Sequence, residues 1–258
     1  FPCKQQRSLG VDEAEIMKIA VKTLGLDELA PFNIRERVIE YVLEDRSNAS
    51  KKLVDMTLKA FANETAAESP APGGGSISAY VGVLGVSLGT MVANLSAHKR
   101  GWDDKWEFYS DWALKGQAYK EELLRLVDED TASFNKILDA FSLPKKTDEE
   151  KSIRQAAVQE ATKGAIMVPF KTMECALKSM EVMLEMAKTG LPASISDAGV
   201  GALCARTCLR GAYLNVKINT KDLLDRAFAD DILHKASALN QQCAEIEDQI
   251  MALVEAQI

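Results

Sequence analysis

Hydrophobic residues along the chain recur every three or four positions, a spacing that places them on one face of an α-helix. Runs in which apolar and polar residues alternate, as in a strand, are scarce. The pattern predicts an all-α protein built as a bundle of about six long helices. We expect these helices at residues 76–97, 106–141, 147–167, 170–188, 197–219 and 232–254.

Proline and glycine set several of the expected boundaries. Pro169 has no N–H to donate, so it must kink or restart the helix that reaches it. Towards the N-terminus, a helix over residues 12–25 should end at Gly25, and a short helix should follow over residues 34–43. Thr57 is a plausible cap for a helix over residues 58–64.

Residues 44–50 are polar and resemble a linker. The chain is therefore expected to divide into an N-terminal helical extension, residues 1–50, and one helical domain, residues 51–258. Its first residue is Phe, and no basic and apolar leader segment follows. We expect the chain to be part of a longer, cytoplasmic polypeptide.

The segment from Gly73 to His98 carries no formally charged side chain and is long enough to cross a bilayer. Gly85 and Gly89 even have the spacing that brings membrane helices together. Much of the segment is Gly, Ser and Ala, however, and small residues also allow close packing within a bundle. We expect a packed helix and no membrane contact.

Charge and cysteine content narrow the classes of protein to which the chain could belong. The net charge of -7 argues against a general nucleic-acid binder, because phosphate backbones are held by Lys and Arg. Five scattered cysteines indicate reduced thiols and not a disulfide framework. His98 and His234 cannot pair locally, and Cys204 and Cys208 lack further soft ligands nearby. No metal site is expected.

Asp130 is the candidate for acid–base chemistry. It shares a helical face with Val127 and Phe134, whereas Asp128 and Glu129 lie off that face and are expected to be solvated. The full set on this face is Leu123, Val127, Asp130, Phe134, Ile137 and Phe141. Burial there would raise the pKa of the carboxyl group into the range useful for proton transfer. A buried Asp satisfied by a cap or an Arg remains the alternative.

Other polar or glycine-rich positions have a structural and a functional interpretation each. Gly73-Gly74-Gly75-Ser76 opens a helix, where free N–H groups could approach a ligand or the glycines could allow two helices to dock. Asn215, Asn219 and Asp222 share a face and could bind a heterocycle or a neighbouring helix. Ser196 and Asp197 could cap a helix, and Lys99 and Arg100 could end one or receive a carboxylate.

Four ordered segments also match a known pattern. They are residues 69–76 (SPAPGGGS), residues 91–95 (MVANL), residues 126–130 (LVDED) followed by Phe134, and residues 211–219 (GAYLNVKIN) continuing to Asp222 and Ala227-Phe228. Together they resemble the cyclodeaminase/cyclohydrolase family of folate enzymes, over residues 53–258. Residues 24–41 are similar to the junction that follows a formimidoyltransferase domain in bifunctional members. This second resemblance favours cyclodeaminase activity over cyclohydrolase activity.

The resemblance implies an enzyme that closes 5-formimidoyltetrahydrofolate to 5,10-methenyltetrahydrofolate and releases ammonia, as in histidine degradation. It implies no cofactor or metal beyond the folate, which carries one or more glutamates. It further implies a homodimer, with small-residue helices at the interface, or a higher homo-oligomer, and a formimidoyltransferase domain on the full-length chain. A methenyltetrahydrofolate cyclohydrolase on the same fold, or a non-enzymatic helical scaffold, remains the alternative.

The family's catalytic carboxylate matches Asp130, which we expect to carry a proton from N10 of the folate to the departing nitrogen. The expected substrate contacts are Gly74, Gly75, Ser76, Asn94, Lys99, Arg100, Ser196, Asp197, Asn215 and Asn219. Among these, Ser76, Asn215 and Asn219 are candidates for orienting the pterin, and Lys99 and Arg100, with Lys217, for binding the glutamate tail. The chain departs from the family pattern at His98 and at residues 190–192.

Overall fold

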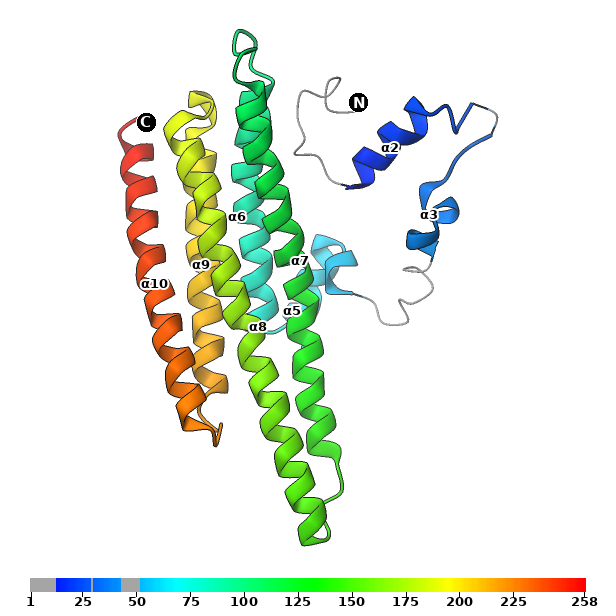
Figure 1. Ribbon diagram of the computed structural model, residues 1–258, viewed down its shortest axis with the longest axis vertical. Helices are drawn as coiled ribbons and strands as arrows, with labels where there is room; N and C mark the ends of the chain where they lie inside the picture. Colours follow the sequence, from blue (N-terminus) through cyan, green and yellow to red (C-terminus); the bar gives the residue numbers. More distant parts are fainter. Residues whose placement is uncertain (1–12, 29, 43–51) are drawn as a thin grey trace.

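A computed structural model of the protein describes residues 13–28, 30–42 and 52–258. These residues contain no strand, and the all-α prediction is confirmed. Five long helices run side by side along the long axis of the molecule (Figure 1). They are α6 (Gly74–Ala97), α7 (Trp106–Ser142), α8 (Asp148–Thr189), α9 (Ile195–Asn219) and α10 (Arg226–Glu255).

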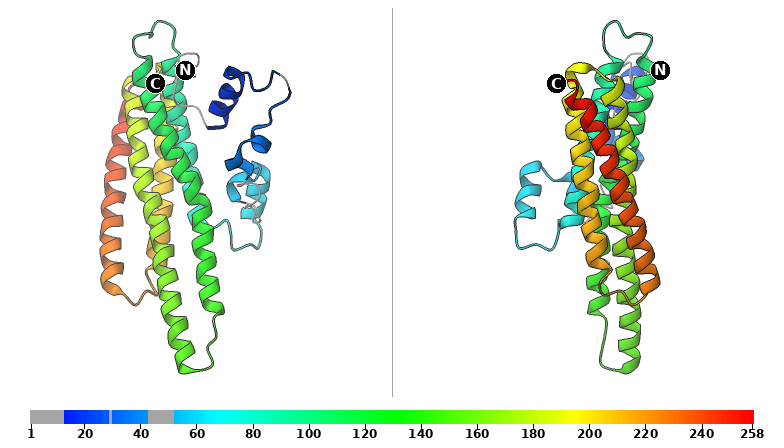
Figure 2. Two further views of the ribbon diagram at one scale, coloured as in Figure 1. Left: turned by 45° about the vertical axis from the view of Figure 1, so that its right-hand side comes forward. Right: turned by 90° about the vertical axis from the view of Figure 1, so that its left-hand side faces the viewer.

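Successive long helices are joined by short loops and therefore run in alternating directions. α7 and α8 are the longest, with 37 and 42 residues. Their connected ends project beyond the lower ends of α9 and α10 as a helical hairpin (Figures 1 and 2). This hairpin leaves part of both helices without cover from α6, α9 or α10.

α8 is one continuous helix, so the expected division into residues 147–167 and 170–188 is wrong. Pro169 lies inside it and is buried. A proline within a helix removes the hydrogen bond to the carbonyl four residues earlier, here that of Ala165. The side-chain amide of Asn219 donates to that carbonyl at 3.0 Å and replaces the missing donor. A partner on α9 thus allows α8 to continue through the proline.

The N-terminal elements are short. α2 (Glu13–Thr23) ends near Gly25, whose φ of 66° is the left-handed conformation that glycine adopts without strain. α3 (Ile34–Arg37) is followed by a bend at Val38 and by further helical residues at 39–42, so the expected helix is interrupted. The predicted linker at residues 44–50 lies outside the described residues.

A short segment leads from there into the bundle. The 3-10 helix η1 (Leu53–Asp55) packs on α7, and α5 (Leu58–Thr65) follows. The cap predicted at Thr57 is confirmed, because its hydroxyl accepts the N–H of Ala60 at 3.2 Å. α5 stands out from the bundle to one side (Figure 2, right) and contacts it through the rings of Phe61 and Tyr80, 5.3 Å apart.

α6 lies at the centre of the packing, against α7, α9 and, less extensively, α8. Its small residues are used for close approach to these neighbours. A β-carbon at Gly85 would lie 2.7 Å from the carbonyl oxygen of Gly201 on α9, so only glycine fits at this crossing. By length and composition α6 could cross a membrane, but 61% of its most apolar stretch is buried inside the bundle. Its apolar character serves the core.

Candidate active site

Asp130 lies in the middle of α7, one turn beyond the fully buried Leu126 and Val127. Loss of solvent raises the pKa of its carboxyl group, and contacts from the Ser76 side chain and backbone oppose that rise in part. No Lys or Arg among the described residues forms an ion pair with Asp130. The alternative of a carboxylate neutralised by an arginine is therefore excluded for the part of the chain that is described.

The hydroxyl of Ser76 connects α6 to this carboxyl group. Its oxygen lies 3.1 Å from Oδ2 of Asp130 and 3.0 Å from the carbonyl oxygen of Val127. A serine hydroxyl has one proton, so it donates to one of these oxygens at a time. The hydroxyl oxygen of Thr131 lies 3.3 Å from the hydroxyl oxygen of Ser76. Ser76 can therefore adjust its donation as the charge on Asp130 changes.

Gly75 provides the space that the carboxyl group occupies. A β-carbon at position 75 would lie 2.5 Å from Cγ of Asp130, closer than atoms in contact can come. A β-carbon at Gly74 would lie 3.3 Å from Nδ2 of Asn215, a tight but smaller conflict. The glycine-rich opening of α6 thus brings two helices close and also forms one wall of the site, so both interpretations of this segment hold.

Asn215 and Asn219 lie on α9 across from Asp130. Nδ2 of Asn215 donates to the carbonyl of Gly211 at 2.9 Å, and Nδ2 of Asn219 donates to that of Ala165 at 3.0 Å. These bonds fix both amide groups and leave their carbonyl oxygens as acceptors. Two fixed acceptors on one helical face can bind the N–H groups at the edge of a flat heterocycle.

These groups surround a cavity of about 230 Å³. It is lined by Pro70, Ala71, Gly73, Gly74, Gly75, Asp130, Thr131, Ser133, Phe134, Ile137, Ala165, Asn215 and Asn219. Five of the residues predicted to form the site line it, and Ser76 reaches it through Asp130. The arrangement can bind a polar heterocycle and exchange a proton with it.

The expected face of α7 is only partly internal. Leu123 and Val127 are fully buried, but Phe134 and Phe141, nearer the C-terminal end of α7, are 38% and 50% exposed. The expectation of a solvated Asp128 is wrong: its Oδ1 accepts the N–H of Leu53 at 2.7 Å, and burial raises the pKa of this carboxyl group as well. The segment around η1 covers it, which the helical pattern of α7 alone does not reveal.

The other predicted residues lie at the far end of α6. Asn94 is 18 residues from Ser76 on one straight helix, which separates them by ~27 Å. Asn94 lines a separate cavity between α6 and α7, and Lys99 and Arg100 lie exposed just beyond it. Within one protomer this group does not meet Asp130.

Ser196 and Asp197 lie at that same end, in the first turn of α9. The helix begins one residue earlier than expected, at Ile195, and its N-cap is Ser194. No side chain caps it, so the capping interpretation of Ser196 and Asp197 is wrong. Lys217, on the last turn of α9, lies over the ring of Tyr213 at 5.4 Å from the ring centre.

Cysteine chemistry does not contribute to the site. Among the described residues, Cys175, Cys204, Cys208 and Cys243 are free thiols, and no group of three His, Cys, Asp or Glu could hold a metal ion. Burial raises the pKa of the Cys175 thiol to about 12, so it stays protonated and unreactive at neutral pH. Cys3 lies outside the described residues.

Comparison with known proteins identifies the family. The sequence profile described as Formiminotransferase-cyclodeaminase matches residues 57–238, which is most of the chain and all of the cavity. The chain belongs to the formiminotransferase-cyclodeaminase family. A second profile, the Formiminotransferase domain, matches residues 1–44, in agreement with the resemblance of residues 24–41.

Individual relatives agree with this family assignment. The formimidoyltransferase-cyclodeaminase of Rattus norvegicus is 37% identical over 94% of the chain, and that of Gallus gallus is 34% identical over 99%. The chain spans less than half of their length, 44% and 47%. The methenyltetrahydrofolate cyclohydrolase of Methylorubrum extorquens is 33% identical over 78% of the chain and 97% of its own length.

A solved structure has the same fold. The formiminotetrahydrofolate cyclodeaminase of Thermotoga maritima superposes with a TM-score of 0.69, over 78% of this chain and 97% of its own, at 24% sequence identity. At that identity the comparison supports the helical fold alone.

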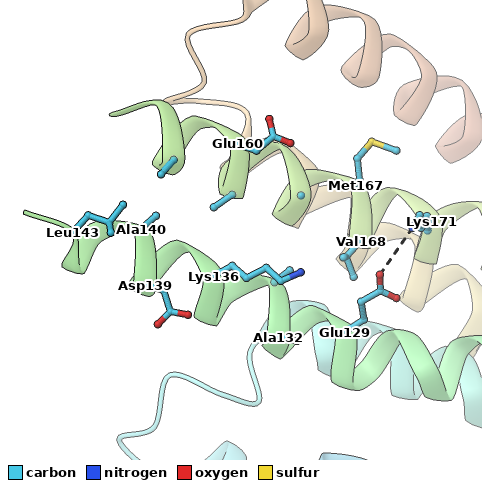
Figure 3. Close-up of a pocket in the computed structure, with 14 residues that line it drawn as sticks. Glu129, Ala132, Lys136, Asp139, Ala140, Leu143, Glu160, Met167, Val168 and Lys171 are labelled. Atoms are coloured by element: carbon cyan, nitrogen blue, oxygen red, sulfur yellow. Dashed lines mark ion pairs between the residues drawn. The ribbon is translucent and has the colours of Figure 1, made fainter. Parts of the chain in front are cut away.

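Several residues of this candidate site had no signal in the sequence. Thr131 follows the acidic run without distinction, and Ala165 comes from the middle of α8. A second, larger cavity between α7 and α8 was also missed (Figure 3). Its one sequence signal is a row of small residues on α8, Ala157, Ala161 and Gly164, spaced four and three apart.

Proposed function

We propose that this chain catalyses the cyclisation of 5-formimidoyltetrahydrofolate to 5,10-methenyltetrahydrofolate with release of ammonia. The observation that carries the proposal is a carboxyl group with a raised pKa, Asp130, in contact with Ser76 at the edge of a cavity that two fixed amides also line. Acid–base chemistry needs such a group, and heterocycle binding needs such amides.

Asp130 carries the proton between two nitrogens. The folate nitrogen N10 attacks the carbon of the protonated formimidoyl group on N5, the new C–N10 bond forms, and Asp130 takes the proton from N10. Asp130 then gives this proton to the amino nitrogen on the same carbon, the C–N bond breaks, and ammonia leaves. The cationic methenyl bridge remains. A raised pKa suits the second transfer, because the carboxyl group then returns its proton readily.

Asn215 and Asn219 orient the pterin. Their amide nitrogens are committed to backbone carbonyls, so their oxygens are the acceptors available to the pterin N–H groups. The reaction closes a ring between two atoms of one molecule, so correct orientation of that molecule supplies much of the rate. We assign the close wall at Gly74 and Gly75 to the same positioning role.

One specific observation supports a cyclohydrolase instead: the similarity to the Methylorubrum extorquens protein, which covers nearly all of that protein. The match of residues 1–44 to a formiminotransferase domain favours cyclodeaminase, since a chain that carries part of that domain would use the transferase product. We therefore propose a formimidoyltransferase domain on the full-length protein as the donor of the substrate. The division of the chain at residue 50 stays a prediction.

The test is to mix the protein with 5-formimidoyltetrahydrofolate and follow methenyl absorbance and free ammonia together. The proposal predicts that both rise at one rate, above the uncatalysed reaction. Hydrolysis of added methenyltetrahydrofolate without any cyclisation would instead identify a cyclohydrolase. Absence of both reactions would support the scaffold alternative.

We further propose that the protein works as a homodimer in the cytoplasm. α6 and α9 each expose large apolar side chains, among them Leu84 and Met91 on α6 and Val200 and Leu203 on α9, and such a surface is typical of a helical interface. Four free thiols suit a reducing compartment. Sedimentation of the purified protein tests the dimer, and a monomeric mass at micromolar concentration would contradict it.

A further inference from the structure

A second cavity lies between α7 and α8, next to the point where the two helices extend beyond α9 (Figure 3). Its volume is about 650 Å³, and its wall is mostly apolar, with Ala132, Met167 and Val168 among the lining residues. Cavities of this size and composition are typical of small-molecule sites. The reaction proposed above assigns no role to it.

Gly164 opens directly onto this space. A β-carbon built at Gly164 meets no atom within 4 Å, in contrast to Gly85, where close backbone contact explains the glycine. Glycine in the interior of a helix is unfavourable unless something requires it. Here the protein offers no contact that does, and the residue faces the cavity. The absent side chain therefore widens the cavity at this point.

This cavity adjoins the Asp130 cavity, because Ser133 lines both. The space beside Asp130 is about 230 Å³, below the roughly 300–1,000 Å³ of pockets that enclose drug-sized ligands. A pterin ring suits it, but a whole folate does not. Of the two reacting nitrogens, N5 belongs to the pterin and N10 to the aminobenzoyl group, so with both at Asp130 the rest of the aminobenzoyl-glutamate half must extend away into other space.

The charges around the α7–α8 cavity favour an anionic ligand at one point. Lys136 lines the cavity and forms no ion pair among the described residues. In Figure 3 it runs along the groove towards Glu129, while the carboxylates of Asp139 and Glu160 point away from the groove. Glu129 already contacts Arg125 and lies 3.9 Å from Lys171. Lys136 is therefore the cation available to a ligand.

We propose that the α7–α8 cavity binds the aminobenzoyl-glutamate half of the folate, with the ring against Val168 and a glutamate carboxylate at Lys136. Lys136 is six residues beyond Asp130, an axial rise of ~9 Å that the aminobenzoyl group and first glutamate span. The inference rests on the proposed function for the identity of the ligand. It replaces Lys99, Arg100 and Lys217 as the expected site of the tail.

The first test measures binding and needs no turnover. The probes are 5-formyltetrahydrofolate, which carries the glutamate, and 5-formyltetrahydropteroate, which lacks it. We expect Lys136→Glu to weaken binding of the first probe about tenfold or more, as for loss of a charge-assisted hydrogen bond, and to leave the second unchanged. Lys145→Glu, at the tip of the same hairpin and outside the cavity, is the matched charge control and should change neither.

The second test fills the cavity. Gly164→Leu places a side chain in open space, so the helix should remain folded, and both probes should bind at least tenfold more weakly. Circular dichroism checks the fold. Unchanged affinity in both Lys136→Glu and Gly164→Leu would overturn the inference, as would loss of the preference for the glutamate in Arg100→Glu alone. Failure of the proposed function is distinguishable, because it would appear as absent cyclisation by the unaltered protein.

Discussion

At the scale of single residues, Asp130 and Gly75 form one unit. A β-carbon at position 75 would occupy the place of the Asp130 carboxyl group. The sequence pattern singled out both residues. It did not show that the position of the Asp130 carboxyl group depends on Gly75, because the two residues lie on different helices and are 55 positions apart along the chain. Thr131 was missed for the same reason: nothing in the acidic run distinguishes it from a solvated residue.

Gly75→Ala should therefore displace the carboxyl group and lower kcat about 100-fold, the usual effect of misplacing a reacting group by ~1 Å. Gly73→Ala is the matched control, because the nearest atom to its built β-carbon is 3.8 Å away. Steady-state kinetics of the two variants measures the difference. Equal activities would show that the close contact between Gly75 and Asp130 does not affect catalysis.

Asp130 should also cost stability at neutral pH. Burial raises its pKa, so the folded protein binds this proton more tightly than the unfolded chain does. Its contribution to the free energy of unfolding is then most favourable below the unfolded pKa and declines as pH rises through the folded pKa. Asp130→Asn should raise or preserve Tm at pH 7 and reduce the fall of Tm between pH 4 and pH 7. A clear loss of Tm at pH 7 would contradict this account.

At the scale of elements, the 3.6-residue pattern predicted α7 closely and α9 and α10 to within several residues. It failed at Pro169, because a rule based on one helix cannot include a donor from another. The amide of Asn219 satisfies the carbonyl that the proline leaves without a partner. Pro169 is thereby a positioning residue, since it creates the acceptor that fixes Asn219.

Pro169→Ala should restore a backbone donor to Ala165 and loosen Asn219. We expect a free energy of unfolding higher by about 1–3 kcal/mol, since proline is unfavourable inside a helix. KM should rise and kcat should fall, each several-fold, because Asn219 both binds and orients the pterin.

Asn219→Ala should raise KM similarly, and the double variant should add little to either single change. Urea denaturation and initial rates provide these values. A KM for Pro169→Ala equal to that of the unaltered protein would refute the positioning role.

At the scale of the whole molecule, the all-α bundle was predictable because the apolar face of each long helix can be recognised from the spacing of its hydrophobic residues. Which residues come together at the candidate site was only partly predictable. Lys99 and Arg100 are near the glycine-rich segment in sequence, but they follow the far end of a straight helix whose last residue, Ala97, is ~32 Å from Ser76. Asn215 is far from Asp130 in sequence and yet lies across the same cavity. Helix direction, and not sequence distance, decides which residues meet.

The α7–α8 hairpin is the other feature of this scale that the sequence did not reveal. Both helices extend past their neighbours, and the row of small residues on α8 leaves a cavity where closer packing was possible (Figures 1 and 3). A periodic pattern reports which side of a helix is apolar. It does not report whether the partner helix fills the space in front of it.

The most direct measurement of the central claim is the rate of methenyltetrahydrofolate formation by Asp130→Asn beside Asp128→Asn. Both changes remove one carboxylate of raised pKa from the same helix, but only Asp130 lines the cavity. The account predicts a loss of about 100- to 10,000-fold for Asp130→Asn and at most a few-fold loss for Asp128→Asn. A rate for Asp130→Asn within a few-fold of the unaltered protein would contradict it.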